Sequence, residues 1–475
     1  MFFNSYFFIL IFLPVTVLGY YVLLNIRKYK SAKIFLTFMS LCFYAYANVS
    51  MLSVIIGSIC FNYVIYILMK KSRWCRLFLT IAILTDLGIL FYFKYYNFFI
   101  DNVNLILKTQ LSIREIVLPL GISFMTFQQI SFVVDVYKGR VEECNFIEYA
   151  LFVSFFPHLM SGPIITYHDF VPLLKDNCRK KVNWDALAGG IYMFVMGLGK
   201  KVLIADVLAR GVDCGYNSLT QLNTTSAVFI SFLYTFQIYF DFSGYSDMAI
   251  GLSRMLNLDL PVNFSSPYKA RTIIEFWDRW HMTLTAFFTR YLYIPLGGSR
   301  KGKMRTWINT MIVFVCSGFW HGASWTFIFW GFLHGLFLTF TKRFRSSIER
   351  LPNILNWIVT MIFVNTTWIL FRAESFSKFR TMCGVLFSNN WGALNADICD
   401  SFQNFLWGWI PGLPYWGGAC GYLIVSAVLV FKCKNVKEKA ETFGFSWQSI
   451  IYTVIIMILS ILSFSSVTTY VYANF

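Results

Sequence analysis

The chain contains 475 residues, of which 57% are hydrophobic, 20% aromatic and only 13% charged. Soluble domains carry about 25% charged residues, and no hydrophilic stretch here is long enough to form such a domain. The net charge of +17 comes from short basic clusters between apolar runs, which is typical of cytoplasmic loops in membrane proteins. A nucleic-acid-binding protein would need a basic face on a folded soluble domain instead. The composition therefore predicts an all-α polytopic membrane protein with a single membrane domain over residues 1–475.

The N-terminal part of the chain has four apolar runs, each close to the length that a membrane-spanning helix needs. They lie at 5–26, 34–49, 51–69 and 77–95. The basic clusters between the runs are expected inside the cell, which places the N-terminus and the segment 97–112 outside. Residues 1–112 are therefore expected to form the N-terminal spans.

The middle of the chain, 116–300, does not divide into clean spans, although apolar runs recur at 188–206 and 224–250. Prolines and glycines interrupt its apolar stretches at Pro119, Gly121, Pro157, Gly162 and Pro163. Broken helices at membrane depth are tolerated only where they are buried in protein or line a cavity. We therefore expect re-entrant pieces in this part of the chain.

The segment FQIYFDFSGYSD at 236–247 places two carboxylates, Asp241 and Asp247, in an apolar setting. Intramembrane carboxylates usually face a cavity or a charged partner and often carry function. The alternative is a structural network in which Asp247 and Arg254, two turns apart on one helical face, hold helices together. The sequence leaves both interpretations open.

The segment 273–298 is too polar to span lipid, and it predicts an amphipathic helix at an interface or along a polar tunnel. On a continuous helix Trp277, His281, Thr285 and Phe288 would share one stripe. His281 is then either an interfacial histidine that reaches water or a residue of the tunnel.

Residues 307–341 lie between two basic clusters, so both ends of this apolar stretch are expected on the cytoplasmic side. The chain must then enter the membrane and return as a hairpin. Fifteen helical residues rise about 22 Å, which places His321 at the deep bend and His334 on the returning arm. A buried neutral imidazole can accept a proton from a hydroxyl. The alternative for His321 is a structural hydrogen bond to a backbone carbonyl, and His334 is expected to line a cavity or to pack.

Further spans are expected at 354–371, 415–431 and 447–469, with an outer loop at 373–414. Four tryptophans in or next to this loop are either interfacial anchors or a surface for a partner: Trp391, Trp407, Trp409 and Trp416.

Several of these segments together resemble the membrane-bound O-acyltransferase superfamily, in particular its bacterial AlgI-like branch. The similarity extends over nearly the whole chain and keeps the family's order. It is carried by LPLGISFMTFQQISFVVDVYKG at 118–139, FPHLMSGPI at 156–164, FQIYFDFSGYSDMAIGLSRMLNLDLPVNFSSPY at 236–268, EFWDRWHMTLTAFFTRYLYIPLGGSR at 275–300, SGFWHGASWTFIFWGFLHG at 317–335 and WILFRAESFS at 368–377.

The resemblance implies a fold of about eleven transmembrane helices, with re-entrant and horizontal helices around a central tunnel. The catalytic core would cover 113–345, and the C-terminal spans 346–475. The family's catalytic histidine falls on His321 in the WHG motif, and its second histidine falls on His281 in RWH. Further candidates for substrate contact or for the tunnel lining are Asn263, Trp277, Arg279, Trp320, Trp325, Asp241 and His334.

The implied activity is transfer of an acetyl group from cytoplasmic acetyl-CoA toward hydroxyls of a cell-surface polysaccharide or peptidoglycan. Such enzymes are multi-pass proteins of the bacterial inner membrane, and they usually work with an extracytoplasmic partner of the SGNH class. No bound cofactor or metal is expected, since acetyl-CoA is the donor substrate. The alternatives are D-alanyl transfer, as in DltB-like relatives, and a transporter or export channel for a small polar solute.

The chain departs from the family's usual pattern at three positions. Asp278 stands where relatives commonly have arginine, and Thr289 and Arg290 stand where they commonly have arginine and aspartate. Asp278 and Arg290 would be about 18 Å apart on a continuous helix, so they form an ion pair only if the helix breaks between them. The departures leave both histidines intact but bear on which acceptor or partner binds here.

Overall fold

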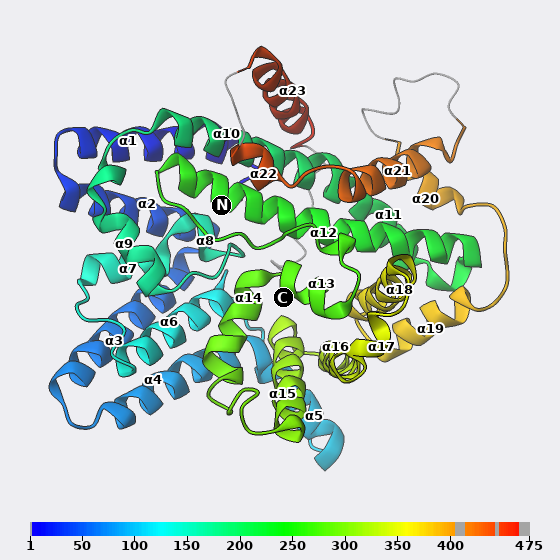
Figure 1. Cartoon of the computed structure of the whole chain (residues 1–475), viewed down its shortest axis with the longest axis horizontal. Helices are drawn as coiled ribbons and strands as arrows, with labels where there is room; N and C mark the ends of the chain where they lie inside the picture. Colours follow the sequence, from blue (N-terminus) through cyan, green and yellow to red (C-terminus); the bar gives the residue numbers. More distant parts are fainter. Residues whose placement is uncertain (1, 404–413, 442–445, 465–475) are drawn as a thin grey trace. The chain divides into compact units, whose positions relative to one another are not determined.

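The computed structural model describes residues 2–403, 414–441 and 446–464, and all regular structure in these ranges is helical (Figure 1). Within these described ranges, four helical segments are long and apolar enough to cross a membrane, at Phe8–Asn25, Val49–Lys71, Cys75–Leu107 and Asn353–Arg372. The predicted all-α class is confirmed, and the apolar helices fit a membrane protein. The count of about eleven spans stays a prediction.

The chain forms two compact units. The first comprises residues 1–194 and 248–262, and the second comprises 195–247 and 263–475. Two helices, α10 (Trp184–Gly199) and α12 (Thr224–Met255), contribute residues to both units. The expectation of a single membrane domain stays a prediction.

The first unit is built mainly from the N-terminal helices. Its other elements are η1 (Phe8–Phe12), α1 (Leu13–Asn25), α2 (Tyr29–Ala47), η2 (Val49–Met51), α3 (Leu52–Lys71), α4 (Cys75–Leu90), η3 (Phe91–Tyr95), α5 (Tyr96–Leu107), α6 (Ile122–Tyr137), α7 (Phe146–Ser154), α8 (Phe156–Leu159), α9 (Tyr167–Lys175) and η4 (Asn177–Lys180).

The predicted interruptions fall where helices of the first unit end. Gly121 precedes α6 with a φ of 69°, a backbone conformation that glycine adopts without steric cost. A side chain at Gly121 would also overlap the main-chain oxygen of Leu159. Pro157 lies in the first turn of the four-residue helix α8, where its missing N–H costs no helical hydrogen bond. Short helical pieces therefore replace long spans in this region.

The second unit contains the polar segments singled out from the sequence. Its other elements are η5 (Lys200–Ala205), α11 (Asp206–Asn217), η6 (Leu219–Gln221), η7 (Pro267–Lys269), α13 (Ile273–Arg279), α14 (Met282–Phe288), η8 (Thr289–Tyr293), α15 (Lys303–His321), α16 (Trp325–Arg343), α17 (Arg345–Ile348), α18 (Asn353–Arg372), α19 (Phe376–Leu386), α20 (Ala396–Asp400), α21 (Gly417–Phe431), α22 (Val436–Glu441) and α23 (Trp447–Leu462).

Buried ion pairs join α12 to the π-helix η5. The Nζ atom of Lys201 lies 2.6 Å from Asp241 and 2.7 Å from Asp206, with all three side chains at most 3% exposed. The Nζ atom of Lys200 lies 2.6 Å from Asp247. Asp247 therefore belongs to a network that joins helices, as one of the two interpretations proposed, but its cation is a lysine of the neighbouring element and not Arg254. A structural role for these carboxylates is the interpretation that the geometry favours.

Helices α15 and α16 form the predicted hairpin, joined by residues 322–324 (Figure 1). Glycines allow the two helices to approach closely. A Cβ at Gly318 would overlap the main-chain oxygen of Phe327, and a Cβ at Gly331 would overlap that of Phe314. His321 is the last residue of α15, and His334 lies on the returning helix α16.

The part of the outer loop that the structure describes is tied to the start of α12. Asn223 donates to the main-chain oxygen of Ala393 at 2.7 Å, and the N–H of Asn395 donates to Ser226 at 2.9 Å. Trp391 in this segment is 64% exposed and Trp416 is 54% exposed. The other two tryptophans of the predicted surface lie outside the described residues: Trp407 and Trp409.

Candidate active site

His281 lies at a break between two short helices, not on the continuous helix that the sequence pattern predicts. Helix α13 ends at Arg279, Trp280 is extended, and α14 begins at Met282. His281 itself has φ 45° and ψ 51°, the left-handed region that costs a residue with a side chain about 1–2 kcal/mol. The predicted stripe through His281 is therefore wrong. Strain of this kind is concentrated at functional sites.

Asn263 holds the His281 ring. The N–H of Thr283 donates to Asn263 Oδ1 at 3.2 Å, which identifies that atom as the amide oxygen. His281 Nδ1 lies 3.1 Å from the same oxygen, and since an amide oxygen only accepts, Nδ1 carries the proton. The neutral ring then presents Nε2 as a hydrogen-bond acceptor. Asn263 Nδ2 in turn donates to Ser246 of α12 at 3.4 Å.

His321 is buried among aromatic rings at the end of α15. Its exposed fraction is 2%, and its ring centroid lies 5.3 Å from that of Trp330 and 5.4 Å from that of Phe371. The next residue, Gly322, leaves room for the Phe327 ring, which a Cβ there would overlap. An imidazole in this setting is shielded from bulk water and is kept beside an apolar wall.

Trp320 brings the two histidines into one site. Its ring centroid lies 6.3 Å from that of His281 and 5.0 Å from that of His321. Trp320 is 5% exposed. The sequence places these histidines in separate segments, and the fold of the second unit packs both of their rings against one indole.

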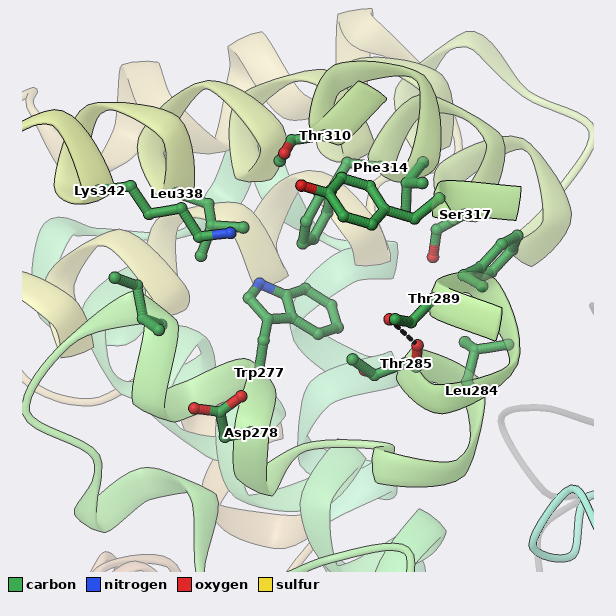
Figure 2. A pocket seen from close by; sticks show the side chains of 14 residues that line it. Trp277, Asp278, Leu284, Thr285, Thr289, Thr310, Phe314, Ser317, Leu338 and Lys342 are labelled. Carbon is green, nitrogen blue, oxygen red and sulfur yellow. Dashed lines mark hydrogen bonds between the residues drawn. The ribbon is translucent and has the colours of Figure 1, made fainter. Parts of the chain in front are cut away.

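A cavity of about 290 Å³ opens in the same unit (Figure 2). It is lined by Ile274, Trp277, Asp278, Leu284, Thr285, Phe288, Thr289, Tyr293, Thr310, Val313, Phe314, Ser317, Leu338 and Lys342. Asp278, Thr289 and Lys342 are exposed and mark its open side. Trp277, Phe314 and Ser317 are buried, so the apolar depth of the cavity lies toward α15.

The deep side of the cavity leads toward His321. Ser317 lines the cavity and precedes His321 by one helical turn on α15, so the two side chains lie on the same face of that helix. The rise between them is about 6 Å. His321 and His281 themselves are not among the lining residues.

Trp277 lies on the wall of this cavity, and His334 lies directly behind Trp277. Figure 2 shows the indole of Trp277 projecting from α13 between Lys342 and Ser317. Its Nε1–H donates to His334 Nδ1 at 3.3 Å. His334 is fully buried and is not a lining residue; it lies behind the indole of Trp277 and the ring of Phe314.

The remaining candidates lie elsewhere. Arg279 pairs with Glu275 at 2.6 Å, with both side chains about one third exposed. Trp325 begins α16 and is 54% exposed, while Asp241 belongs to the buried ion pairs of Lys201. The helix breaks between Asp278 and Arg290, which is the condition that the sequence set for an ion pair between them. In the structure Asp278 lines the cavity together with Lys342 (Figure 2).

Sequence reasoning missed the two lysines that neutralise the carboxylates of α12. The signal was available, because Lys200 and Lys201 stand side by side in an otherwise apolar run. It also missed the cavity lining by Tyr293 and Thr310, for which the sequence offers no periodic signal.

Among the residues that the structure describes, no group of three or more histidine, cysteine, aspartate or glutamate side chains could hold a metal ion.

Residues 41–376 match the model of the membrane-bound O-acyltransferase family. The chain therefore belongs to this family and is an acyltransferase. It is 41% identical over 406 residues to a peptidoglycan O-acetyltransferase of Helicobacter pylori, covering 78% of this chain and 77% of that protein. It is 37% identical to a probable alginate O-acetylase AlgI of Pseudomonas aeruginosa, covering 82% and 75%. A teichoic acid D-alanyltransferase of Bacillus subtilis is 27% identical over 273 residues, 54% of this chain and 69% of that protein.

Proposed function

We propose that the protein transfers an acetyl group from cytoplasmic acetyl-CoA across the membrane toward hydroxyls of a cell-surface polysaccharide or peptidoglycan. The observation that supports this most is the cavity whose deep side ends one helical turn from His321. The names of the relatives, which are O-acetyltransferases or O-acetylases, favour an acetyl group. An extracytoplasmic partner of the SGNH class would carry the group to the polymer, and the protein would reside in the inner membrane.

In the proposed reaction His321 is the general base. It takes the proton of the attacking hydroxyl as that oxygen bonds to the thioester carbonyl carbon. The carbon–sulfur bond then breaks, and the proton passes to the CoA sulfur, so the products are an O-acetyl ester and free CoA. His281, held with its proton on Nδ1, orients the acceptor or assists proton transfer through Nε2. Trp320 and Trp330 restrict water, which would otherwise hydrolyse the thioester.

The open side of the cavity carries one acidic and one basic side chain, Asp278 and Lys342, and the basic residues near Lys342 in sequence suit the phosphates of the donor. Lys342 lies at the cavity, and basic residues are abundant in the two neighbouring segments 300–305 and 342–350. Cations attract the phosphates of CoA by ordinary electrostatics. Polar side chains of the lining, such as Thr285 and Tyr293, provide partners for amide groups of the pantetheine arm.

Radiolabelled acetyl-CoA tests this function when it is incubated with membranes and cell-wall fractions. We expect label in the polymer, and we expect His321→Ala to reduce transfer about a hundredfold or more, the usual contribution of a general base. His168→Ala, at an exposed histidine of the first unit, is the matched control and keeps full transfer. Full transfer by His321→Ala at equal expression refutes the catalytic role. Label from a D-alanyl-loaded carrier protein, with none from acetyl-CoA, identifies D-alanyl transfer instead.

A further inference from the structure

The indole of Trp277 is held in one orientation by a directed chain of hydrogen bonds. Trp277 Nε1–H donates to His334 Nδ1 at 3.3 Å. His334 Nε2 lies 3.0 Å from Thr367 Oγ1, and the Thr367 hydroxyl donates to the main-chain oxygen of Val364 at 3.0 Å. The chain runs from α13 through α16 to α18.

The direction of this chain fixes the tautomer of His334. An indole nitrogen can only donate, so Nδ1 of His334 carries no proton. The proton of the neutral ring is then on Nε2, from which it is donated to Thr367. Trp277 is 6% exposed, His334 is fully buried and Thr367 is 2% exposed. Breaking either bond therefore leaves a buried polar group unsatisfied, which is unfavourable.

The held indole lies close to the candidate base. Trp277 packs on Phe314, with ring centroids 5.1 Å apart, and on Trp330 at 5.9 Å. Trp330 in turn packs edge-on against His321 at 5.3 Å. The indole is therefore a wall of the cavity that is separated from His321 by one aromatic ring.

We propose that His334 is a positioning residue whose hydrogen bond to Trp277 limits the acyl group of the donor to a short chain. The inference rests on the proposed function, because it concerns the thioester that the cavity receives. With the indole fixed, the part of the cavity beside Phe314 is closed to additional methylene groups. Without the bond to Nδ1, the indole is free to rotate about its side-chain torsions, and the cavity widens at this wall.

The test compares acetyl-CoA with butyryl-CoA as donors for the full-length protein in membranes. The measured quantity is kcat/KM for each thioester, and its ratio reports selectivity independently of how much protein folds. We expect His334→Leu and Trp277→Phe each to raise the butyryl-to-acetyl ratio about tenfold, in line with the discrimination that methylene groups allow. His334→Asn places an amide oxygen near the position of Nδ1 and restores most of the selectivity.

The matched control removes a comparable bond away from the cavity. Trp368 Nε1–H donates to the hydroxyl of Tyr268 at 3.1 Å, so Tyr268→Phe leaves another buried indole without its acceptor. This variant is expected to lower the melting temperature and to leave the donor ratio unchanged. An unchanged ratio in both His334→Leu and Trp277→Phe overturns the inference, as does an equal change in Tyr268→Phe.

Nitrogen-15 NMR of the histidine-labelled protein separates failure of the inference from failure of the proposed function. The signal of His334 is identified by its disappearance in His334→Asn. A neutral ring with its proton on Nε2 supports the hydrogen-bond chain, and a proton on Nδ1 overturns it. This measurement needs no turnover. In the other outcome, the wild-type protein shows that tautomer and yet consumes neither acetyl-CoA nor butyryl-CoA. This result refutes the proposed function and, with it, the assignment of donor selectivity to His334.

Discussion

Lys201→Met tests whether the charged cluster of α12 and η5 is structural. The substitution keeps a long apolar side chain but removes the cation between Asp206 and Asp241. The lysine nitrogen lies 2.7 Å and 2.6 Å from the two carboxylates. Both carboxylates then remain in a buried setting without their shared counter-charge.

The expected cost follows from the burial of the cluster. Lys201 and Asp206 are each 1% exposed and Asp241 is 3% exposed, so solvent does not compensate for the lost cation. Removing one partner of a buried pair usually costs about 3–5 kcal/mol. We therefore expect the free energy of unfolding to fall by about that amount.

The assay is denaturant or thermal unfolding of the purified protein in one detergent, with Lys378→Met as the matched control. Lys378 pairs with Glu374, and the two side chains are 43% and 65% exposed, so this loss is expected to be about 0–1 kcal/mol. The Lys378 hydrogen bond lowers the pKa of Glu374 below its ordinary value of 4.5. The small contribution of this pair is thus present at neutral pH and is lost as the pH falls through the lowered pKa.

Equal, small losses in the two lysine variants would refute the structural role of Lys201. A compensating variant sharpens the result. In Lys201→Met combined with Asp206→Asn and Asp241→Asn, all three charges are removed, and the stability is expected to recover in large part because no unpaired carboxylate remains. Recovery of stability without recovery of acetyl transfer would assign the cluster a functional role as well.

Gly331→Ala is expected to destabilise the hairpin by about 1–3 kcal/mol, because its Cβ would overlap a main-chain oxygen of the facing helix. The same substitution at Gly384, which has open space around its Cβ position, is expected to be neutral or to stabilise α19 by up to about 1 kcal/mol; equal melting temperatures for the two variants would contradict this. Asn263→Ala is expected to lower kcat for acetyl transfer about tenfold or more, because His281 loses the oxygen that fixes its tautomer; steady-state kinetics with unchanged kcat would count against a role for His281.

The hairpin could be predicted from the sequence because a long apolar run lies between two basic clusters. Two basic clusters that are both expected on the cytoplasmic side bracket 307–341, and an apolar run between such clusters is expected to turn back. The positions of His321 at the bend and His334 on the return followed from counting residues. The break at Trp280 and His281 could not be predicted in this way, since no proline or glycine marks it and the apolar spacing continues across it.

The partners of the buried charges depend on tertiary structure. Asp247 and Arg254 have the spacing of a helical pair, yet the π-helix η5 brings Lys200 to Asp247. The cavity likewise combines residues from five elements, and only Trp277 among them was a candidate from the sequence. Its Lys342 belongs to a basic cluster from which the sequence predicted membrane sidedness, and nothing in the sequence placed it at the same cavity as Asp278.

The break at His281 has a consequence for biosynthesis. Helices α13 and α14 have seven residues each, and isolated helices shorter than about 12–15 residues are marginal in water. Their order therefore depends on partners that the ribosome makes later: Trp277 needs His334, and Trp280 packs on Trp368 at 5.0 Å. A nascent chain that ends before α18 thus lacks the contacts that assemble the site. These contacts are complete only after nearly four fifths of the chain, up to Trp368 of 475 residues, has been synthesised.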